Sequence, residues 1–505
     1  MNKKIRELED LGRLTESLRK EGKTIAHCHG CFDLMHPGHI KHFEAAKAAA
    51  DILIVTITPD RFVNKGPGRP VFNERIRMEA ITALQCVDYV SLNKWETAVE
   101  TIKIIKPHLY VKGQDYKDRS KDITKGIYKE EEAVKSVGGT LFITEEIQFS
   151  SSALINAHMS PYDENVNLYR ENFKDSHSAE TIIETITSLS DLKVLVLGDT
   201  IIDEYHYATP LGKSSKSPTI SSKFVEGNTY AGGILAIANH INQFAGTVEL
   251  FTVLGKGDSN EKLIEERLTP GISKNFFYRD DSPTPTKRRY LDKYLNIKLF
   301  EVTFMNDHYL EKELEDQLIE AIQNKLPEVD LIVLADFGHG MITPRIIKFL
   351  EDSGKFLCVN AQTNSNNYGY NYITKYNRAD FISIDENELR LPFGEKFGEL
   401  EVLINRLSAI SHCSNIQVTL GQKGSILFQN NNFNFAPALA MAVKDSVGAG
   451  DAVLSLTSLL AFKNAPPEVI SFVGNCVGSL AVEIIGNEHP VYKKDLLKFI
   501  NHFLK

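Results

Sequence analysis

The stretch from Lys444 to Val453, KDSVGAGDAV, decides the fold of the C-terminal two thirds of the chain. Its two glycines allow a tight turn, and the apolar run over 452–462 predicts a buried helix. Such a turn points N–H groups and the positive end of the helix dipole at one spot, which suits a phosphate. Asp451 can then accept the proton of a hydroxyl that attacks the phosphate. An ordinary helix start fits this pattern equally well, so the rest of the chain must decide.

The bulk composition indicates a globular protein of several domains. The chain has 505 residues, of which 42% are hydrophobic and 24% are charged, and this length favours two or three domains. The net charge of −9 and the pI near 6.0 argue against a nucleic-acid partner and against binding to a membrane surface.

The cysteines and the start of the chain predict a cytoplasmic location. Six cysteines are scattered through the sequence, and only Cys28 and Cys31 have the spacing of a metal pair. The N-terminus is charged, and no apolar run of the roughly 18 residues needed to span a membrane occurs.

The first domain, predicted over residues 1–160, opens with a parallel βαβ unit. Residues 24–29 read as a strand, 40–50 as a helix and 51–57 as a second strand rich in Ile and Val. In such a Rossmann-like unit the site is expected at the carboxyl end of the first strand.

The sequence HGCFDLMHPGH over 29–39 occupies that position. His36 and His39 are three residues apart at a helix start, so both can face one ligand. A zinc site lacks a third ligand at a supporting spacing. A phosphate site fits better, because imidazole N–H groups beside a helix N-terminus can bind a triphosphate. A buried structural histidine pair is the alternative.

This segment resembles the HxGH motif of the cytidylyltransferase-like nucleotidyltransferases. KGPGRP over 65–70, Arg77, VKGQDY over 111–116 and FSSS over 149–152 follow in the expected order. Over residues 20–156 the set is most similar to the adenylyltransferase domain of bacterial ADP-heptose synthesis enzymes. Glycerol-3-phosphate cytidylyltransferases share the first and last motifs and resemble the middle two less.

The resemblance implies a role for individual residues. His36 and His39 would contact the nucleotide phosphates, and Lys47 and Arg77 would neutralise them, although both could instead be solvated helix charges. The remaining nucleotide or phosphate contacts implied are Gly30, Phe32, Asp33, Lys112, Asp115, Ser151 and Ser152.

Residues 161–190 are polar and predict a linker with one docking helix, and 191–505 predict a second α/β domain. Its strands at 193–197, 331–335, 356–359, 381–384 and 416–420 alternate with helical segments, as in a doubly wound sheet. The stretches 206–230 and 285–304 read as a β-rich insertion, a small lid.

The ordered motifs of this domain resemble those of the ribokinase-like (PfkB) sugar kinases. They are Asp199 with Asp203, Gly232-Gly233, DFGHG over 336–340, TLGQKG over 419–424 and DSVGAGD over 445–451. The resemblance implies that Asp451 is the catalytic base and that Gly448, Ala449 and Gly450 form the anion hole. It places Thr419, Gly421, Gly424 and Asn475 at the ATP, Asp203, Gly232, Gly233 and Arg289 at the sugar, and Asp385 and Glu388 at magnesium.

Two departures put the acceptor in question. Ala236 stands where heptose kinases carry a sugar-contacting Asn, and loss of a buried hydrogen-bonding partner can change discrimination by orders of magnitude. The cluster Lys287-Arg288-Arg289 is either a phosphate contact or a solvated basic edge.

Together these patterns predict a cytoplasmic bifunctional transferase of nucleotide-sugar synthesis, acting on sugar phosphates with ATP or CTP and Mg²⁺. The resemblance implies a kinase for heptose 7-phosphate, an ADP-heptose-like product for lipopolysaccharide, a homodimer, and a domain order opposite to that of the usual bifunctional heptose enzyme. One alternative is a cytidylyltransferase for a glycerol- or pentitol-type phosphate fused to another sugar kinase. The other is a second domain that is an inactive sensing or dimerising module.

Overall fold

The structure is a computed structural model, and it describes residues 3–117, 126–144 and 151–505, except for the side chains of Asp115, Ser151, Ala153, Ala157 and His158. The chain forms two compact units. Unit 1 comprises Met1–Asp163 and Lys494–Lys505, and unit 2 comprises Glu164–Lys493. Among the described residues, no helix is both long enough and apolar enough to cross a membrane.

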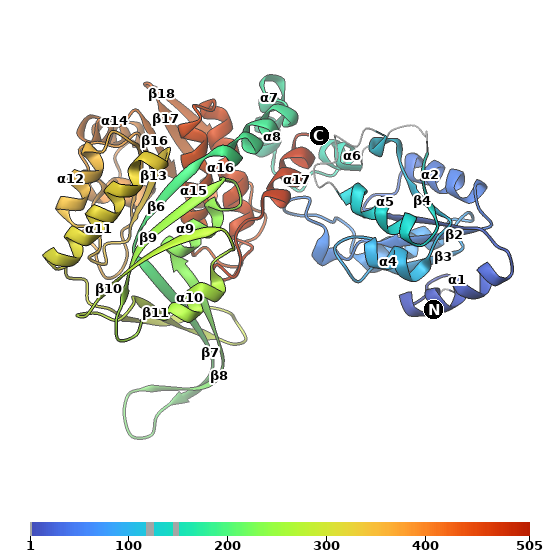
Figure 1. Ribbon diagram of the computed structural model, residues 1–505, viewed down its shortest axis with the longest axis horizontal. Coiled ribbons are helices and arrows are strands. Elements are labelled where there is room, and N and C mark those ends of the chain that lie inside the picture. The colour runs from blue at the N-terminus through green and yellow to red at the C-terminus, as the bar shows by residue number, and fades with distance from the viewer. Residues whose placement is uncertain (1–2, 118–125, 145–150) are drawn as a thin grey trace. The chain divides into compact units, whose positions relative to one another are not determined.

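Unit 1 is built on a parallel five-stranded sheet of order β3-β2-β1-β4-β5 (Figure 1). The strands are β1 (Ile25–Gly30), β2 (Ile52–Ile57), β3 (Tyr89–Leu92), β4 (Leu109–Lys112) and β5 (Thr140–Ile143). The helices are α1 (Leu8–Lys20), α2 (Pro37–Ala48), α3 (Glu74–Thr82), α4 (Val99–Ile105), α5 (Gly126–Ser136) and α6 (Ser151–His158). The predicted βαβ unit is thereby confirmed as β1-α2-β2.

The last helix of the chain, α17 (Lys493–Phe503), packs within unit 1. The sequence had assigned residues up to 505 to the second domain, so this return to the first unit is a difference. Its cause is an apolar face on α17, formed by the buried side chains Leu496, Leu497, Phe499, Ile500 and Phe503.

The main sheet of unit 2 has the order β10-β9-β6-β13-β14-β15-β16-β17-β18. It is parallel from β10 to β16 and antiparallel from β16 to β18. The strands are β6 (Lys193–Gly198), β9 (Thr247–Gly255), β10 (Ile272–Arg279), β13 (Leu331–Asp336), β14 (Phe356–Ala361), β15 (Phe381–Asp385), β16 (Asn415–Thr419), β17 (Ser425–Gln429) and β18 (Asn432–Ala436). This confirms the predicted doubly wound domain.

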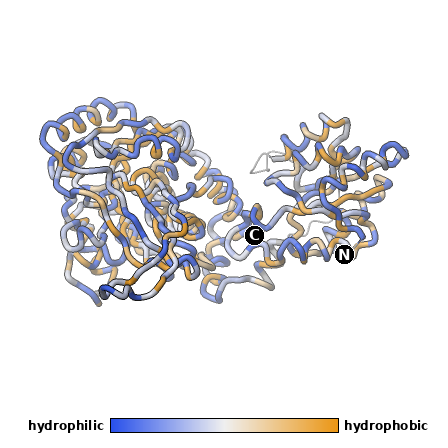
Figure 2. Tube along the Cα trace, turned by 90° about the horizontal axis from the view of Figure 1, so that it is seen from below, coloured by the Kyte–Doolittle hydropathy of each residue, from blue (hydrophilic) through white to orange (hydrophobic). Residues whose placement is uncertain are grey.

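Helices cover both faces of this sheet (Figure 1). One face carries α9 (Ile234–Ile241), α15 (Ala449–Phe462) and α16 (Pro467–Ala481), and the other carries α11 (Lys312–Lys325), α12 (Pro344–Asp352) and α14 (Leu400–Ser411). The shorter α10 (Glu261–Arg267) and α13 (Glu386–Arg390) belong to the same unit. Because both faces are covered, the central strands are apolar runs, and hydrophobic segments gather inside unit 2 (Figure 2).

A second, four-stranded sheet of order β12-β11-β7-β8 forms the lid. Its strands are β7 (Thr200–Lys213), β8 (Ile220–Gly233), β11 (Thr286–Asp292) and β12 (Lys298–Phe304). The long β7–β8 hairpin projects from the unit (Figure 1). The segment expected to be mainly linker holds the helices α7 (Glu164–Ser176) and α8 (Ala179–Thr187), both in unit 2.

Candidate active sites

The two histidines of the HxGH motif meet where α2 begins in unit 1. His36 is the N-cap of α2, and its ring stacks on that of His39 with centroids 3.9 Å apart. The ring of Phe32 meets His39 edge-on at 5.3 Å. The pair therefore stands at the positive end of a twelve-residue helix, where an anion is favoured.

Burial keeps both imidazoles neutral at physiological pH. It lowers the pKa of His36, and it lowers the pKa of His39 to about 3, with smaller effects from His36, His42 and Lys65. A neutral imidazole retains one N–H donor. The pair can thus donate hydrogen bonds to phosphate oxygens, while nearby cations such as Lys65 balance the charge.

The residues just before the histidines shape the loop. Phe32 has φ of +49°, and a β-carbon at Gly30 would lie 2.9 Å from the far end of the Phe32 ring, so a larger residue there would displace the ring. The buried Asp33 accepts hydrogen bonds at 3.0 Å from the N–H groups of Val71 and Phe72, and lies 3.7 Å from Arg69. The carboxylate thus holds the end of the KGPGRP segment and the residues that follow it, and its expected nucleotide contact stays a prediction.

The phosphate contact expected of Lys47 stays a prediction, and the structure places this residue away from the histidine pair. Lys47 is in the last turn of α2, ~16 Å along the helix from His36 at 1.5 Å per residue. Its ammonium binds the Asp88 carboxylate at 2.7 Å and the carbonyl oxygen of Asp51. The lysine neutralises a carboxylate at the opposite end of the helix.

The phosphate contact expected of Arg77 also stays a prediction, and in the structure its side chain has partners within the protein. Arg77 is 1% exposed and its guanidinium pairs with Asp60 at 2.5 Å. It also donates to the carbonyl oxygens of Cys31, Thr58 and Phe72. With all its donors used inside the protein, Arg77 locks the loops around the site.

Lys112 and Ser152 each have a partner within the protein. The Lys112 ammonium lies 2.8 Å from the buried Glu130 carboxylate, which outweighs burial and raises the pKa of Lys112. The Ser152 hydroxyl lies 2.9 Å from Nδ1 of His502. The side chains of Asp115 and Ser151 fall outside the described part of the chain, so their predicted roles stay predictions.

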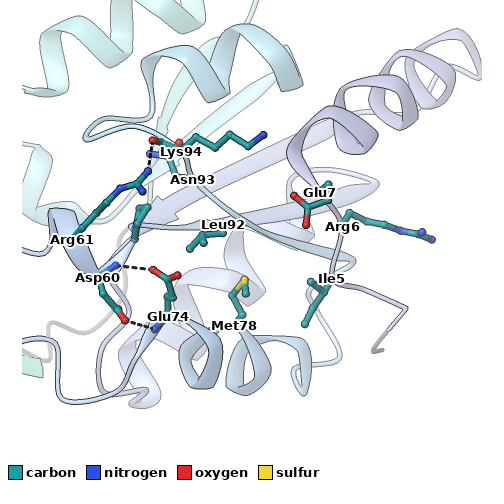
Figure 3. A pocket seen from close by; sticks show the side chains of 11 residues that line it. Ile5, Arg6, Glu7, Asp60, Arg61, Glu74, Met78, Leu92, Asn93 and Lys94 are labelled. Carbon is teal, nitrogen blue, oxygen red and sulfur yellow. Dashed lines mark hydrogen bonds between the residues drawn. The ribbon is translucent and has the colours of Figure 1, made fainter. Parts of the chain in front are cut away.

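A separate cavity of about 460 Å³ lies beside the ends of β2 and β3. It contains none of the predicted site residues. Figure 3 shows that Asp60 and Glu74 each accept a hydrogen bond from the other's backbone N–H on one wall. These carboxylates are used in holding the start of α3.

In unit 2, the glycine-rich turn opens α15 as predicted. Gly448 is the N-cap with φ of +82°, and a β-carbon there would lie 2.1 Å from the Asn487 side-chain oxygen. A β-carbon at Gly450 would meet no atom within 4 Å. The Ala449 N–H makes only a 3.4 Å contact with the Ser446 carbonyl. Glycine is thus needed at 448 because of the positive φ and the close approach of Asn487. Gly450 faces open space that suits a transferred phosphoryl group.

Asp451 lies buried in the first turn of α15. Burial, aided by the charge of Asp203 and opposed by Lys287, raises the pKa of Asp451 to about 7. A carboxyl group with this pKa can take and release a proton near neutrality, which suits the general base that the sequence predicted.

Asp203, on the lid strand β7, is fixed by its neighbours. A β-carbon at Gly232 would lie 2.1 Å from the Asp203 carboxylate, and one at Gly233 would lie 2.6 Å from the Asp199 carbonyl. The two glycines therefore allow the end of β8 to approach these residues closely. Arg289 forms an ion pair with Asp203 and another at 2.8 Å with Glu301. The predicted sugar contact of Arg289 stays a prediction, and two carboxylates balance its charge.

Two buried residues, Lys287 and His339, had no individual prediction. Lys287 acts electrostatically on both Asp203 and Asp451. Lys287 is buried, and burial lowers its pKa against the pull of Asp203 and Glu301. His339 is 1% exposed, and neither ring nitrogen has a hydrogen-bond partner among the described residues. Burial lowers the pKa of His339 to about 3, with a contribution from Lys287. Both sit inside quoted motifs, but only the structure shows their burial.

The predicted magnesium residues form a helix cap. The Asp385 side chain accepts from the Glu388 N–H at 2.8 Å, and Glu388 accepts from the N–H groups of Asp385 and Thr363. Burial raises the pKa of Glu388 to about 8, with smaller effects from Asp385 and Asp451. No cluster of three potential ligands occurs among the described residues. Such carboxylates fit an ion held through water better than one bound directly.

The expected ATP-site residues lie along β16 and its turn. Thr419 pairs with Asp385 in the sheet, and Gly421 faces open space at φ of +57°. Gly424 is required because a β-carbon would lie 2.0 Å from the Ala436 carbonyl. The Asn475 amide accepts from Ser425 and donates to the carbonyls of Ala436 and Pro437. These bonds hold the chain at the end of β18, and the predicted contact of Asn475 with the nucleotide base stays a prediction.

Asp445, the first residue of DSVGAGD, ties the glycine turn to the lid sheet. Its carboxylate accepts from the Tyr205 hydroxyl at 2.6 Å and from the Lys298 ammonium at 2.8 Å. Lys298 and Tyr205 outweigh burial and lower the pKa of Asp445. The turn that leads to Asp451, the predicted base, is therefore fixed by Asp445 to both β7 and β12.

Comparison with known proteins gives two family matches. A cytidylyltransferase-like family matches residues 27–157, and the pfkB family carbohydrate kinases match residues 191–493. The bifunctional protein HldE of Aliarcobacter butzleri is 40% identical over 141 residues, which is 27% of this chain and 29% of the relative. HldE of Gluconobacter oxydans is 37% identical over 147 residues, 29% of each. The matched region thus spans under a third of these relatives.

A solved structure supports the fold of unit 2. Phosphofructokinase-2 from Escherichia coli in complex with substrates and products has 13% sequence identity and a TM-score of 0.50, over 62% of this chain and 100% of that one. Such low identity supports the fold alone. The pfkB match covers more than half of the 505 residues, and the chain therefore belongs to the pfkB family of carbohydrate kinases.

Proposed function

We propose that the chain is a bifunctional enzyme of nucleotide-sugar synthesis. Unit 2 transfers the γ-phosphoryl group of ATP to a sugar phosphate, heptose 7-phosphate by resemblance, and unit 1 transfers a nucleotidyl group from ATP to a sugar 1-phosphate and releases pyrophosphate. The observation that carries this proposal is Asp451, buried at the start of α15 with a pKa of about 7 beside Asp203. The order of the two domains, transferase first, is part of the proposal.

In the kinase reaction, Asp451 removes the proton of the acceptor hydroxyl as its oxygen attacks the γ-phosphorus. The turn from Gly448 to Gly450 and the start of α15 stabilise the negative charge on the transferred group. Asp203 accepts hydrogen bonds from sugar hydroxyls. The buried cation Lys287 takes the phosphate-facing role first considered for Arg289, because Arg289 is committed to two carboxylates.

In the transferase reaction, an oxygen of the sugar 1-phosphate attacks the α-phosphorus of the nucleotide and pyrophosphate leaves. His36 and His39 hold the phosphates through N–H donors at the start of α2. Positioning and charge stabilisation account for such a reaction without a covalent intermediate. Arg77 and Asp33 contribute by fixing the surrounding loops.

Magnesium would accompany the nucleotide and neutralise charge on its phosphates. In unit 2 Asp385 and Glu388 would hold it through water, because their oxygens already accept backbone N–H groups. The chain's own residues still place the acceptor and remove its proton.

A second candidate differs in the nucleotide. The family that matches residues 27–157 is cytidylyltransferase-like, which favours CTP as the nucleotide, and a glycerol- or pentitol-type phosphate would then be the acceptor. Turnover with CTP and none with ATP would select this candidate.

We also propose a cytoplasmic homodimer. All six cysteines are free, as expected in a reducing compartment. The lid sheet exposes apolar side chains, with Phe224 at 57%, Phe300 at 56% and Phe304 at 41%, and exposed apolar patches mark interaction sites. Light scattering on the wild type and on Phe300→Glu tests the dimer, which the substitution should dissociate.

The test of the proposed function is product identification. The full-length protein is incubated with a panel of sugar phosphates and with MgATP or MgCTP, and the products are identified by mass spectrometry. We expect a bisphosphorylated heptose from ATP and a nucleotide-linked sugar from a sugar 1-phosphate. Absence of any phosphorylated sugar across the panel would contradict the kinase assignment.

A further inference from the structure

The chain's C-terminal helix lies against the transferase motifs. Phe499 of α17 is 1% exposed, and a β-carbon at Gly66 would lie 2.3 Å from its ring. Gly66, with φ of +95°, is the second residue of the KGPGRP segment. Nearby, the Asn64 amide donates to the Asp495 carboxylate at 2.9 Å. The backbone of the KGPGRP loop thus packs directly against the Phe499 ring of α17.

A second set of contacts joins α17 to α6. Nδ1 of His502 lies 2.9 Å from the Ser152 hydroxyl. The Asn156 amide donates to the carbonyl oxygen of His502 at 2.8 Å, and its oxygen accepts from the Arg69 guanidinium at 3.1 Å. Because Arg69 also belongs to KGPGRP and faces Asp33, α6, α17 and this loop form one continuous network.

The same region gathers positive charge. Lys65 acts electrostatically on His39, on Lys498 and on His502, and Arg69 acts on His502 as well. Burial lowers the pKa of Lys498 and of His502, and Lys65 lowers both further, whereas the Asp495 and Glu96 carboxylates act in the opposite direction on Lys498. These carboxylates offset the charge of Lys498, but only cations act on His502 beside its burial. A nucleotide triphosphate or the departing pyrophosphate would supply negative charge beside Lys65, Arg69 and His502.

We propose that residues 494–505 form one wall of the transferase site, with His502 as a positioning residue that holds Ser152 and Phe499 as the support of the KGPGRP loop. This inference rests on the proposed nucleotidyl transfer in unit 1. Its consequence is that the first activity depends on the last helix of the chain, which follows the residues matched to the kinase family.

The test compares two substitutions of similar size in the full-length protein. His502→Asn keeps a polar atom near the place of Nδ1, whereas His502→Leu does not. We expect His502→Leu to raise the KM for the nucleotide about tenfold in pyrophosphate release, as the loss of one hydrogen bond implies, and to change kcat less. His502→Asn should stay within about threefold of the wild type by the same argument. Sugar-dependent ADP release by unit 2 should be equal in both.

A second readout needs no turnover. Hydrogen exchange of the backbone amides in 64–69 and 152–158 should be faster in His502→Leu than in His502→Asn. Equal kinetics and equal exchange in the two variants would overturn the inference. If the wild type releases no pyrophosphate with any substrate, the proposed transfer fails, while the exchange comparison still decides whether His502 positions Ser152.

Discussion

Asp451 provides a direct test at the scale of a single residue. A catalytic base must be deprotonated, and the pKa of this carboxyl group is raised to about 7 by burial and by Asp203. We therefore expect kcat/KM for sugar-dependent ADP release to rise with pH and to level off above about pH 7. Initial rates between pH 5 and pH 9 measure this profile. A rate that is flat across that range would contradict the assignment.

Lys287 should tune that profile. Its charge lowers the pKa of Asp451 against the larger effect of burial, so Lys287→Met should shift the midpoint of the pH profile upward and raise the KM for the sugar phosphate at least tenfold, the effect of ~1.4 kcal/mol. Arg288→Met is the matched control, because Arg288 pairs with Glu204 and should leave the midpoint in place. Equal profiles in the two variants would remove Lys287 from the site.

The sequence motif of Asp451 could be recognised because a glycine turn, an acid and an apolar helix follow one another in the chain. The ion pairs of Lys47, Arg77 and Arg289 could not be predicted, because their partners Asp88, Asp60 and Asp203 are not adjacent to them in sequence. A charged side chain can be assigned to a ligand only after the opposite charge beside it is known.

At the scale of the element, the turn before α15 separates a structural glycine from one that makes room for a ligand. Gly448→Ala places a β-carbon 2.1 Å from Asn487 at positive φ, so it should lower both the melting temperature and the kinase rate, with a cost of at least ~1 kcal/mol. Gly450→Ala meets nothing within 4 Å, so it should keep the melting temperature and raise the KM for ATP. Equal melting temperatures for the two variants would contradict this division.

The elements themselves followed from the sequence wherever periodicity was strong. The parallel strands β6 and β13 read as apolar runs. The lid was predicted only as a β-rich insertion over 206–230 and 285–304, and the bounds of its strands came from the structure. The return of α17 to unit 1 could not be predicted, because its apolar face shows only that it packs and not on which unit. In the segment 161–190 one docking helix was predicted and α8 lies there, whereas α7 was missed because polar residues dominate its sequence.

At the scale of the whole molecule, the central claim is that one chain holds two separate catalytic sites. The proposed kinase site uses β7, β11 and α15 of unit 2, and the proposed transferase site uses β1, α2 and α6 of unit 1 with α17. The proposed base Asp451 belongs to unit 2, and the proposed phosphate-binding residues His36 and His39 belong to unit 1. The loss of one activity should therefore leave the other intact.

Two substitutions measured in parallel test this claim most directly. Sugar-dependent ADP release and pyrophosphate release are assayed in Asp451→Asn and in His39→Ala. We predict that Asp451→Asn lowers the first activity at least ~100-fold and keeps the second, and that His39→Ala does the reverse. Survival of sugar-dependent ADP release in Asp451→Asn, or equal loss of both activities in either folded variant, would contradict the account.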